Sequence, residues 1–296
     1  MTYQQFIESI ALEINETLPK GIHAQIHSSL KNNNISRLGI TISDSNVNIS
    51  PTIYMEEFYQ EYQQGLSISE ISSIVLDIYD EIRFDQSWEL EEIREFSSIK
   101  HRIVYKLIHK KENSLLLAEV PYIPYHDLAI VFYILLEIES SGSGTILITN
   151  SMLQAWDISV HDLYLAASEN AATLLPPKFN TMHSVLCEML GTDCVDGDFA
   201  DNHMYILTNS MSQFGAATIL YKNLLEQIAL ELQDDFYILP CSVHEVIILP
   251  RSYSPCPEDI DRMIVEINET QIAPDEVLSD HSYYYSRLHK ALFLTH

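Results

Sequence analysis

The sequence is poor in glycine and cysteine, and each shortage excludes a class of protein. Its eight glycines form neither G-x-G-x-x-G nor G-x-x-x-x-G-K-[ST], so neither of these phosphate-binding loops is present. Four irregularly spaced cysteines are too few for a disulfide framework in 296 residues. We therefore expect free thiols in a reducing cytoplasm, and the motifs imply no cofactor.

Basic residues and long hydrophobic runs are also scarce. Sixteen Lys and Arg stand against 42 Asp and Glu, a net charge of −26. Such a surface repels phosphate backbones, which argues against direct nucleic-acid binding. The longest apolar run, residues 128–136, is about half the length of a bilayer span. The first residues contain Glu8, Glu13 and Glu16 where a signal peptide would be basic, so we expect a cytoplasmic protein without membrane contact.

The apolar residues follow both helical and strand periods, which predicts an α+β protein. Helical spacing occurs over residues 6–18 and again after Ser67, where Ser67 and Glu70 form a capping-box pattern. Alternating or continuous apolar runs predict strands at 22–30 and 101–108 and a hairpin formed by 128–138 and 145–149. We expect mixed or mainly antiparallel sheets with helices packed on one face.

Pro176-Pro177 and the acidic stretch after it indicate a boundary. The prediction is an N-terminal α+β region at 1–175, an acidic connection at 176–202 and a C-terminal α+β region at 203–296. The last region is expected to contain a strand pair (MYILT and FGAATIL), a helix, a second strand pair (FYILP and HEVIILP) and a helix.

Cys241, His244 and Glu245 are the candidates for catalysis, because a thiol needs a neighbouring imidazole to become a thiolate at neutral pH. Positions three apart on a continuous strand point to opposite faces, so the Cys241–His244 pair requires a turn at 240–242. The alternative is a strand-turn-strand that places His244 and Glu245 near the rim of a sheet. The common hydrolase motifs are absent.

Four further residues are candidate zinc ligands. His183 and Cys187 lie four apart on one expected helix, and Cys194 and His203 follow. The last two are separated by eight residues, whereas structural zinc sites use compact ligand pairs, so incidental Cys and His are the alternative.

Acidic residues are concentrated at 56–95, where twelve face only Arg83 and Arg94, while five basic residues gather at 100–111. Either the basic segment compensates the acids internally, or an acidic helical surface is presented to a basic partner. Tyrosine is abundant, and Tyr283 and Tyr284 are candidates for docking because tyrosine is a frequent interface anchor.

Several segments, taken together, resemble a family of bacterial proteins known only as a domain of unknown function. The resemblance is carried by NISPTIYMEEFYQEY, GTILITN, MYILTN with FGAATILY, FYILPCSVHEVIILP and INETQIAPDEVLSD. It implies a compact intracellular α+β protein that occurs as a stand-alone chain, and it implies no activity. Polar residues inside these segments include Asn209, Ser242, His244 and Glu245.

Two hypotheses of function follow. The first is a non-enzymatic interaction or regulatory protein that binds a basic partner protein, with a nucleic-acid mimic or inhibitor as its narrower form. The alternative is an enzyme or small-ligand-binding protein with a site near Asn209 and Ser242–Glu245.

Overall fold

The computed structural model describes residues 1–48, 50–83, 93–138, 142–191 and 203–295. The chain divides into two compact units. The first contains Met1–Lys31, Ile35–Glu95 and Leu136–Gly144, and the second contains Asn32–Asn34, Phe96–Leu135 and Thr145–His296. The expected connection at 176–202 therefore falls within the second unit. Part of it is sheet, since β8 (Pro177–Thr181) pairs with β9 (Tyr205–Asn209).

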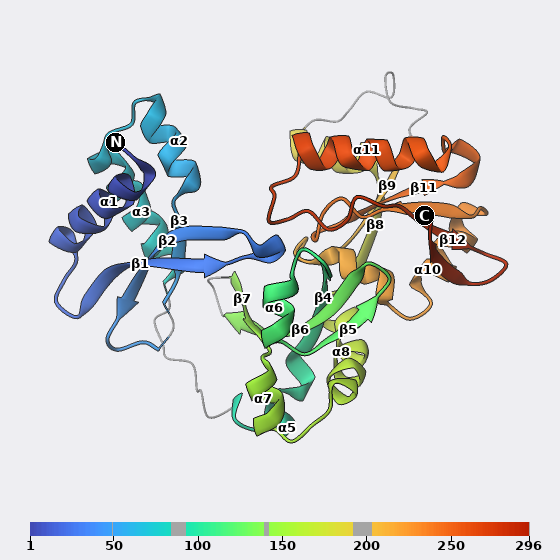
Figure 1. Cartoon of the computed structure of the whole chain (residues 1–296), viewed down its shortest axis with the longest axis horizontal. Helices are drawn as coiled ribbons and strands as arrows, with labels where there is room; N and C mark the ends of the chain where they lie inside the picture. Colours follow the sequence, from blue (N-terminus) through green and yellow to red (C-terminus); the bar gives the residue numbers. More distant parts are fainter. Residues whose placement is uncertain (49, 84–92, 139–141, 192–202, 296) are drawn as a thin grey trace. The chain divides into compact units, whose positions relative to one another are not determined.

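The described residues of the first unit pack three helices and a three-stranded antiparallel sheet around one core (Figure 1). Its helices are α1 (Tyr3–Thr17), α2 (Glu56–Gln64) and α3 (Ile68–Ile82), and its strands are β1 (Ile22–Leu30), β2 (Ser36–Asp44) and β3 (Thr52–Tyr54). Strand order is β1-β2-β3. Phe6, Ile10, Ile40, Ile71 and Val75 are fully buried in this core. The helical apolar stripes predicted for α1 and α3 are thus confirmed as their buried faces.

A second sheet is built around one long buried strand. The strands are β4 (Ile103–His109), β5 (Tyr122–Tyr125), β6 (Leu128–Ile138) and β7 (Gly142–Leu147), with β6 paired to all three others. Leu128 to Leu136 are all buried, which explains the continuous apolar run in the sequence. Helix α8 (Val160–Leu174) packs against β4.

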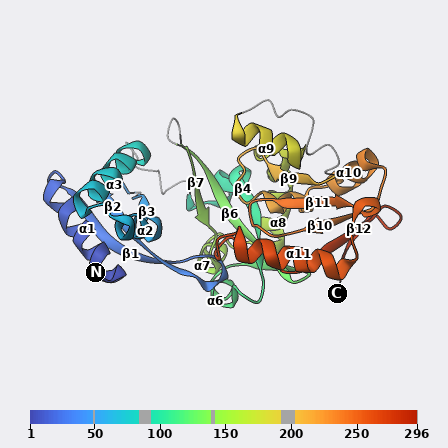
Figure 2. The same cartoon turned by 90° about the horizontal axis from the view of Figure 1, so that it is seen from above.

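The third sheet has six antiparallel strands in the order β13-β12-β10-β11-β9-β8. Its remaining strands are β10 (Phe236–Leu239), β11 (Val246–Pro250), β12 (Tyr283–Ser286) and β13 (Ala291–Leu294). Helix α11 (Pro257–Thr270) covers one face through Ile260 and Ile264, and α10 (Leu224–Leu232) lies on the opposite side (Figure 2). Alternate residues of β10 therefore enter two different cores.

The FGAATIL segment corrects one strand prediction. It forms a short 3-10 helix, η3 (Gly215–Leu220), in which five consecutive residues are buried. Sequence MYILT does form β9, but η3 packs against it without extending the sheet. The other short helices of the described chain are η1 (Asn32–Asn34), α5 (Phe96–Ile99), η2 (Lys100–Arg102), α6 (Ser114–Glu119), α7 (Asn150–Ala155), α9 (Met182–Leu190) and η4 (Arg251–Tyr253).

Overall, the described residues form an α+β protein with three antiparallel sheets. None of the helices they form combines the length and the apolar character that a bilayer span needs.

The capping box of α3 generates a stability prediction. Ser67 Oγ accepts a hydrogen bond from the Glu70 amide at 3.2 Å, and the Ser67 amide donates to Glu70 Oε2 at 2.9 Å. Ser67→Ala should lower the free energy of unfolding by about 1 kcal/mol, because the Glu70 amide loses its acceptor and the Glu70 carboxylate loses the hydroxyl donor of Ser67. Ser73→Ala, at an exposed position inside the same helix, should leave it unchanged or slightly raised. Urea denaturation checks both variants, and equal losses would contradict the cap.

Candidate functional site

The segment that carries the three catalytic candidates and Ser242 joins β10 to β11. Strand β10 ends at Leu239 and β11 begins at Val246, so residues 240–245 form a connection between two strands. Ser242 Oγ accepts a hydrogen bond from the His244 amide at 3.0 Å, which closes a local turn. The strand-turn-strand alternative is therefore the observed structure, although Ser242 also bridges to Val277.

The ring of His244 is held on both of its nitrogen atoms. The Phe214 amide donates to Nδ1 at 3.3 Å, and Nε2 lies 3.6 Å from Glu276 Oε1. The Phe214 ring stacks on the imidazole with 5.7 Å between centroids. Because Nδ1 accepts a hydrogen bond, the neutral imidazole carries its proton on Nε2, where it faces Glu276. The Nε2 edge of the ring thus faces a carboxylate at ion-pair distance, without a direct hydrogen bond.

A close backbone approach fixes this connection against β9. Thr208 Oγ1 donates to the His244 carbonyl at 2.8 Å. At Gly215 a Cβ would lie 2.5 Å from the same carbonyl oxygen and 2.2 Å from Thr208 Oγ1. Only glycine fits at that point, so η3 and the 240–245 connection are positioned together.

Cys241 is buried, and this burial works against a nucleophilic role. Desolvation, assisted by the nearby Glu245 carboxylate, raises the pKa of the Cys241 thiol to about 12. Such a thiol stays protonated at neutral pH. The described polar contacts of the His244 ring are to Phe214 and Glu276, not to Cys241. Burial also raises the pKa of Glu245, and the neighbouring His244 opposes that shift.

Asn209 uses its side-chain amide inside the protein. It is buried at the end of β9, where Nδ2 donates to the Gln213 carbonyl at 2.8 Å and Oδ1 accepts from the Met211 amide at 3.0 Å. Both groups therefore stabilise the turn that leads into η3.

The two tyrosines predicted to dock a partner lie on opposite faces of β12. Tyr283 is fully buried, and its hydroxyl donates to Asp127 Oδ1, so it presents no surface for docking. Tyr284 donates its hydroxyl to Asp235 Oδ2 on the other face. The alternation of side chains along a strand explains why neighbouring tyrosines have different surroundings.

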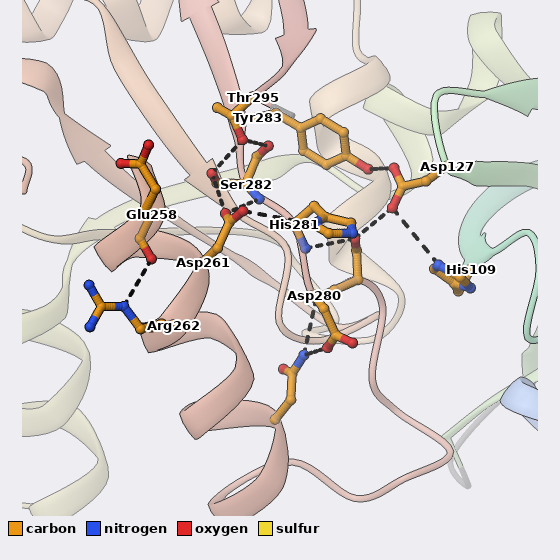
Figure 3. A network of polar contacts seen from close by, with 12 residues as sticks. His109, Asp127, Glu258, Asp261, Arg262, Asp280, His281, Ser282, Tyr283 and Thr295 are labelled. Carbon is orange, nitrogen blue, oxygen red and sulfur yellow. Dashed lines mark hydrogen bonds and ion pairs between the residues drawn. The ribbon is translucent and has the colours of Figure 1, made fainter. Parts of the chain in front are cut away.

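The hydroxyl of the buried Tyr283 belongs to the network of polar contacts drawn in Figure 3. Asp127 also accepts a hydrogen bond from Ser279 Oγ at 2.6 Å on Oδ2, and His109 Nε2 lies 3.9 Å from that oxygen. The His281 amide donates to Ser279 Oγ at 3.1 Å. One carboxylate thus collects two hydroxyl donors and a neighbouring imidazole.

A second carboxylate continues the network along the same segment (Figure 3). Asp261 Oδ1 accepts from the amide and hydroxyl of Ser282 at 2.9 and 2.7 Å, while His281 Nδ1 lies 3.7 Å from Oδ2. Ser279 and Ser282 donate to carboxylates and not to imidazoles. Neither serine therefore shows the serine–imidazole hydrogen bond of a Ser-His pair, and the hydrogen bonds join the 279–282 segment to α11 and to the turn between β5 and β6.

The candidate zinc ligands do not assemble in the described residues. His183 Nε2 and Cys187 Sγ are 3.6 Å apart on α9, but Cys187 is disulfide-bonded, which corrects the expectation of a free thiol there. His203 instead stacks on the ring of Tyr253. Cys194 lies outside the described residues. Within the described ranges, no three His, Cys, Asp or Glu side chains are grouped to hold a metal.

Comparison with known proteins identifies the family. A model for a family of unknown function, DUF5688, matches residues 3–287, so the chain belongs to that family. This confirms the resemblance to an uncharacterised family. No curated protein and no solved structure shows significant similarity to the chain.

Close packing at Gly215 yields a test of how the 240–245 connection is held. Gly215→Ala should lower the free energy of unfolding by about 2–3 kcal/mol, because the added methyl meets backbone atoms that cannot move independently. Gly191→Ala is the control, since its φ of +62° strains an alanine but no atom of the described residues lies within 4 Å of the added methyl, and we expect a loss of about 1 kcal/mol. Chemical denaturation compares the two, and equal losses would show that backbone freedom alone matters.

The Asp127 network generates a second stability prediction. Tyr283→Phe should lower the free energy of unfolding by about 1–2 kcal/mol, because Asp127 Oδ1 loses its hydroxyl donor in a partly buried site. Tyr285→Phe is matched, since Tyr285 is equally part of β12 and buried, yet its hydroxyl has no hydrogen bond to a described residue. That variant should change little. The prediction fails if both variants unfold at the same urea concentration.

Proposed function

We propose that this protein is a non-catalytic binding module that engages a basic partner protein through the acidic helices of its first unit. The proposal rests on the exposure of four carboxylates on α2 and α3 and on their lack of partners among the described residues. Glu57, Glu61, Asp77 and Glu81 are exposed, and none forms an ion pair or side-chain hydrogen bond with a residue that the structure describes. Residues 1–83 contain eleven acidic and four basic side chains.

Exposed carboxylates of one sign repel one another, so a partner that carries Lys and Arg lowers the electrostatic free energy when it binds. Attraction of this kind speeds encounter and selects partners more than it adds affinity. Because the charges are exposed, salt screens them within about 10 Å at ordinary ionic strength. The binding should therefore weaken strongly as salt is added.

A nucleic-acid mimic is the narrower form of the same proposal. In that form the carboxylates of α2 and α3 occupy the groove in which the partner binds phosphates. Duplex DNA or RNA should then displace this protein from its partner, whereas a partner that binds only acidic proteins would be unaffected by either nucleic acid.

The alternative, a small-ligand or catalytic site near Asn209 and Ser242–Glu245, has weaker support. The side chains of Asn209 and Ser242 form hydrogen bonds within local turns. The feature in its favour is the pairing of His244 Nε2 with Glu276, both of whose side chains are partly exposed.

The acidic-surface proposal is tested with two variants that remove equal charge. One combines Glu57→Gln, Glu61→Gln, Asp77→Asn and Glu81→Gln. The control combines Glu119→Gln, Glu188→Gln, Glu266→Gln and Glu269→Gln, four exposed glutamates of the second unit. Each protein is immobilised, exposed to lysate, and its retained proteins are quantified by mass spectrometry at low and high salt.

We expect basic proteins that are lost at high salt to be lost also on the α2–α3 variant and kept by the control. Equal loss on both variants would mean that bulk charge, and not this surface, attracts them. Retention of no salt-sensitive basic protein by the unmodified chain would overturn the proposal.

A further inference from the structure

The second unit contains a hollow of about 440 Å³ whose walls combine aromatic rings and carboxylates. It is lined by residues from the start of β9, the end of α10 and η4. The side chains that carry the argument are His203, Tyr205, Glu231, Asp234, Ser252 and Tyr253. Among the residues singled out from the sequence, only the zinc candidate His203 lines this hollow.

The aromatic rings of the hollow are stacked in pairs at the surface. Tyr253 is 58% exposed, and its ring lies over that of His203 with 3.4 Å between centroids and 21° between planes. Tyr205 stacks on Phe179 at 5.0 Å. Tyrosine faces carry negative partial charge and attract cations. Rings that are held by a stacked neighbour can receive such a group without losing much side-chain freedom.

The electrostatics of the end of α10 favour a cation. Glu231 is the penultimate residue of this helix, where the unpaired carbonyl groups are already negative, and the last turn has no basic residue. An acid at that position destabilises an isolated helix. The Glu231 carboxylate has no polar partner among the described residues, and it lines the hollow.

A second carboxylate of the hollow is fixed in place. Asp234 Oδ2 accepts a hydrogen bond from the Ser252 amide at 2.8 Å. Nearby arginines are engaged elsewhere, since Arg251 pairs with Asp235 and Arg287 donates to the Gln233 carbonyl. The positive charge that would balance Glu231 and Asp234 is therefore not supplied by these neighbouring side chains.

We propose that this hollow binds the guanidinium group of an arginine side chain on the basic partner. The inference rests on the proposed function and names the side chain that the partner inserts. A guanidinium group is planar, so it stacks on the Tyr253 ring while its N–H groups donate to the Glu231 and Asp234 carboxylates. It is also less strongly hydrated than the ammonium of lysine, which makes arginine the better ligand for a ring and a carboxylate together.

The test is a titration of the full chain with the capped peptide Gly-Arg-Gly, followed by the amide chemical shifts of the protein. We expect shifts centred on residues 231–234 and 252–253, and an affinity about threefold or more above that of capped Gly-Lys-Gly. The combined variant Glu231→Gln with Asp234→Asn should weaken arginine-peptide binding about tenfold, because asparagine keeps the acceptor for Ser252 but removes the charge.

Three further variants separate the role of the ring from that of charge. Tyr253→Phe should keep the affinity, whereas Tyr253→Ala should lower it about fivefold. Glu269→Gln is the charge control, since Glu269 is the exposed penultimate residue of α11 and lies outside the hollow. It should bind like the unmodified chain. Equal affinity of the Glu231/Asp234 variant and the unmodified chain, or shifts confined to other residues, would overturn the inference.

The outcome is distinguishable from that of the acidic-surface proposal. If the α2–α3 variant loses basic proteins while the Glu231/Asp234 variant binds the arginine peptide as before, the hollow is not an arginine site and the proposed function stands. If the arginine peptide binds the hollow but no basic protein is retained in a salt-sensitive way, the proposed function fails. The guanidinium site is then supported as one for a free guanidinium-bearing molecule, and its assignment to a partner protein is overturned.

Discussion

Hydrogen bonds to the Asp127 carboxylate join parts of the second unit that lie far apart in the chain. This carboxylate lies between β5 and β6, and its two oxygens accept hydroxyl groups from Ser279 and Tyr283, which precede and begin β12. The four-stranded and six-stranded sheets are thereby joined at a point that is partly buried. A carboxylate in such a place needs donors, and neutral hydroxyl groups provide them without a second buried charge. The Lys110 amide, which donates to the Asp127 carbonyl, fixes the same turn from its other side.

The sequence predicted those elements whose signal is local. Ser67 and Glu70 predict the start of α3, and the apolar run at 128–136 predicts a buried strand. Both patterns depend only on residues that are neighbours in the sequence. FGAATIL shows the limit of that reasoning. Its residues are small or apolar and nearly all buried, so its composition suits a central strand equally well. The deciding fact is the approach of Gly215 to the His244 carbonyl, 29 residues away in the chain, which no period reveals.

The candidate sites also differ in whether their residues are close together in the sequence. The turn around Ser242 and His244 was open to prediction because proline, serine and a polar pair lie together in the sequence. The two hydroxyl donors to Asp127 lie more than 150 residues from it in the chain. Tyr283 was predicted as a surface anchor because only the pairing with β10 shows which side of β12 is buried. Glu231 did carry a local signal. An acid in the last turn of a helix, followed by Asp234 and Asp235, runs against the usual charge preference of helix ends.

Acidic groups serve two opposite purposes in this chain, and the shortage of bases explains the division. With sixteen basic residues for 42 acids, the carboxylates that must be buried are satisfied mainly by hydroxyl and amide donors, as at Asp127 and Asp261. Asp235 adds to its arginine contact a tyrosine hydroxyl and an amide. With so few bases, the exposed carboxylates gain little from ion pairs within the chain. Salt ions or a bound cation can reduce the repulsion between them. A surface kept acidic in this way is the basis of the proposed attraction for a basic partner, while the described carboxylates Asp127 and Asp261 are held by neutral donors.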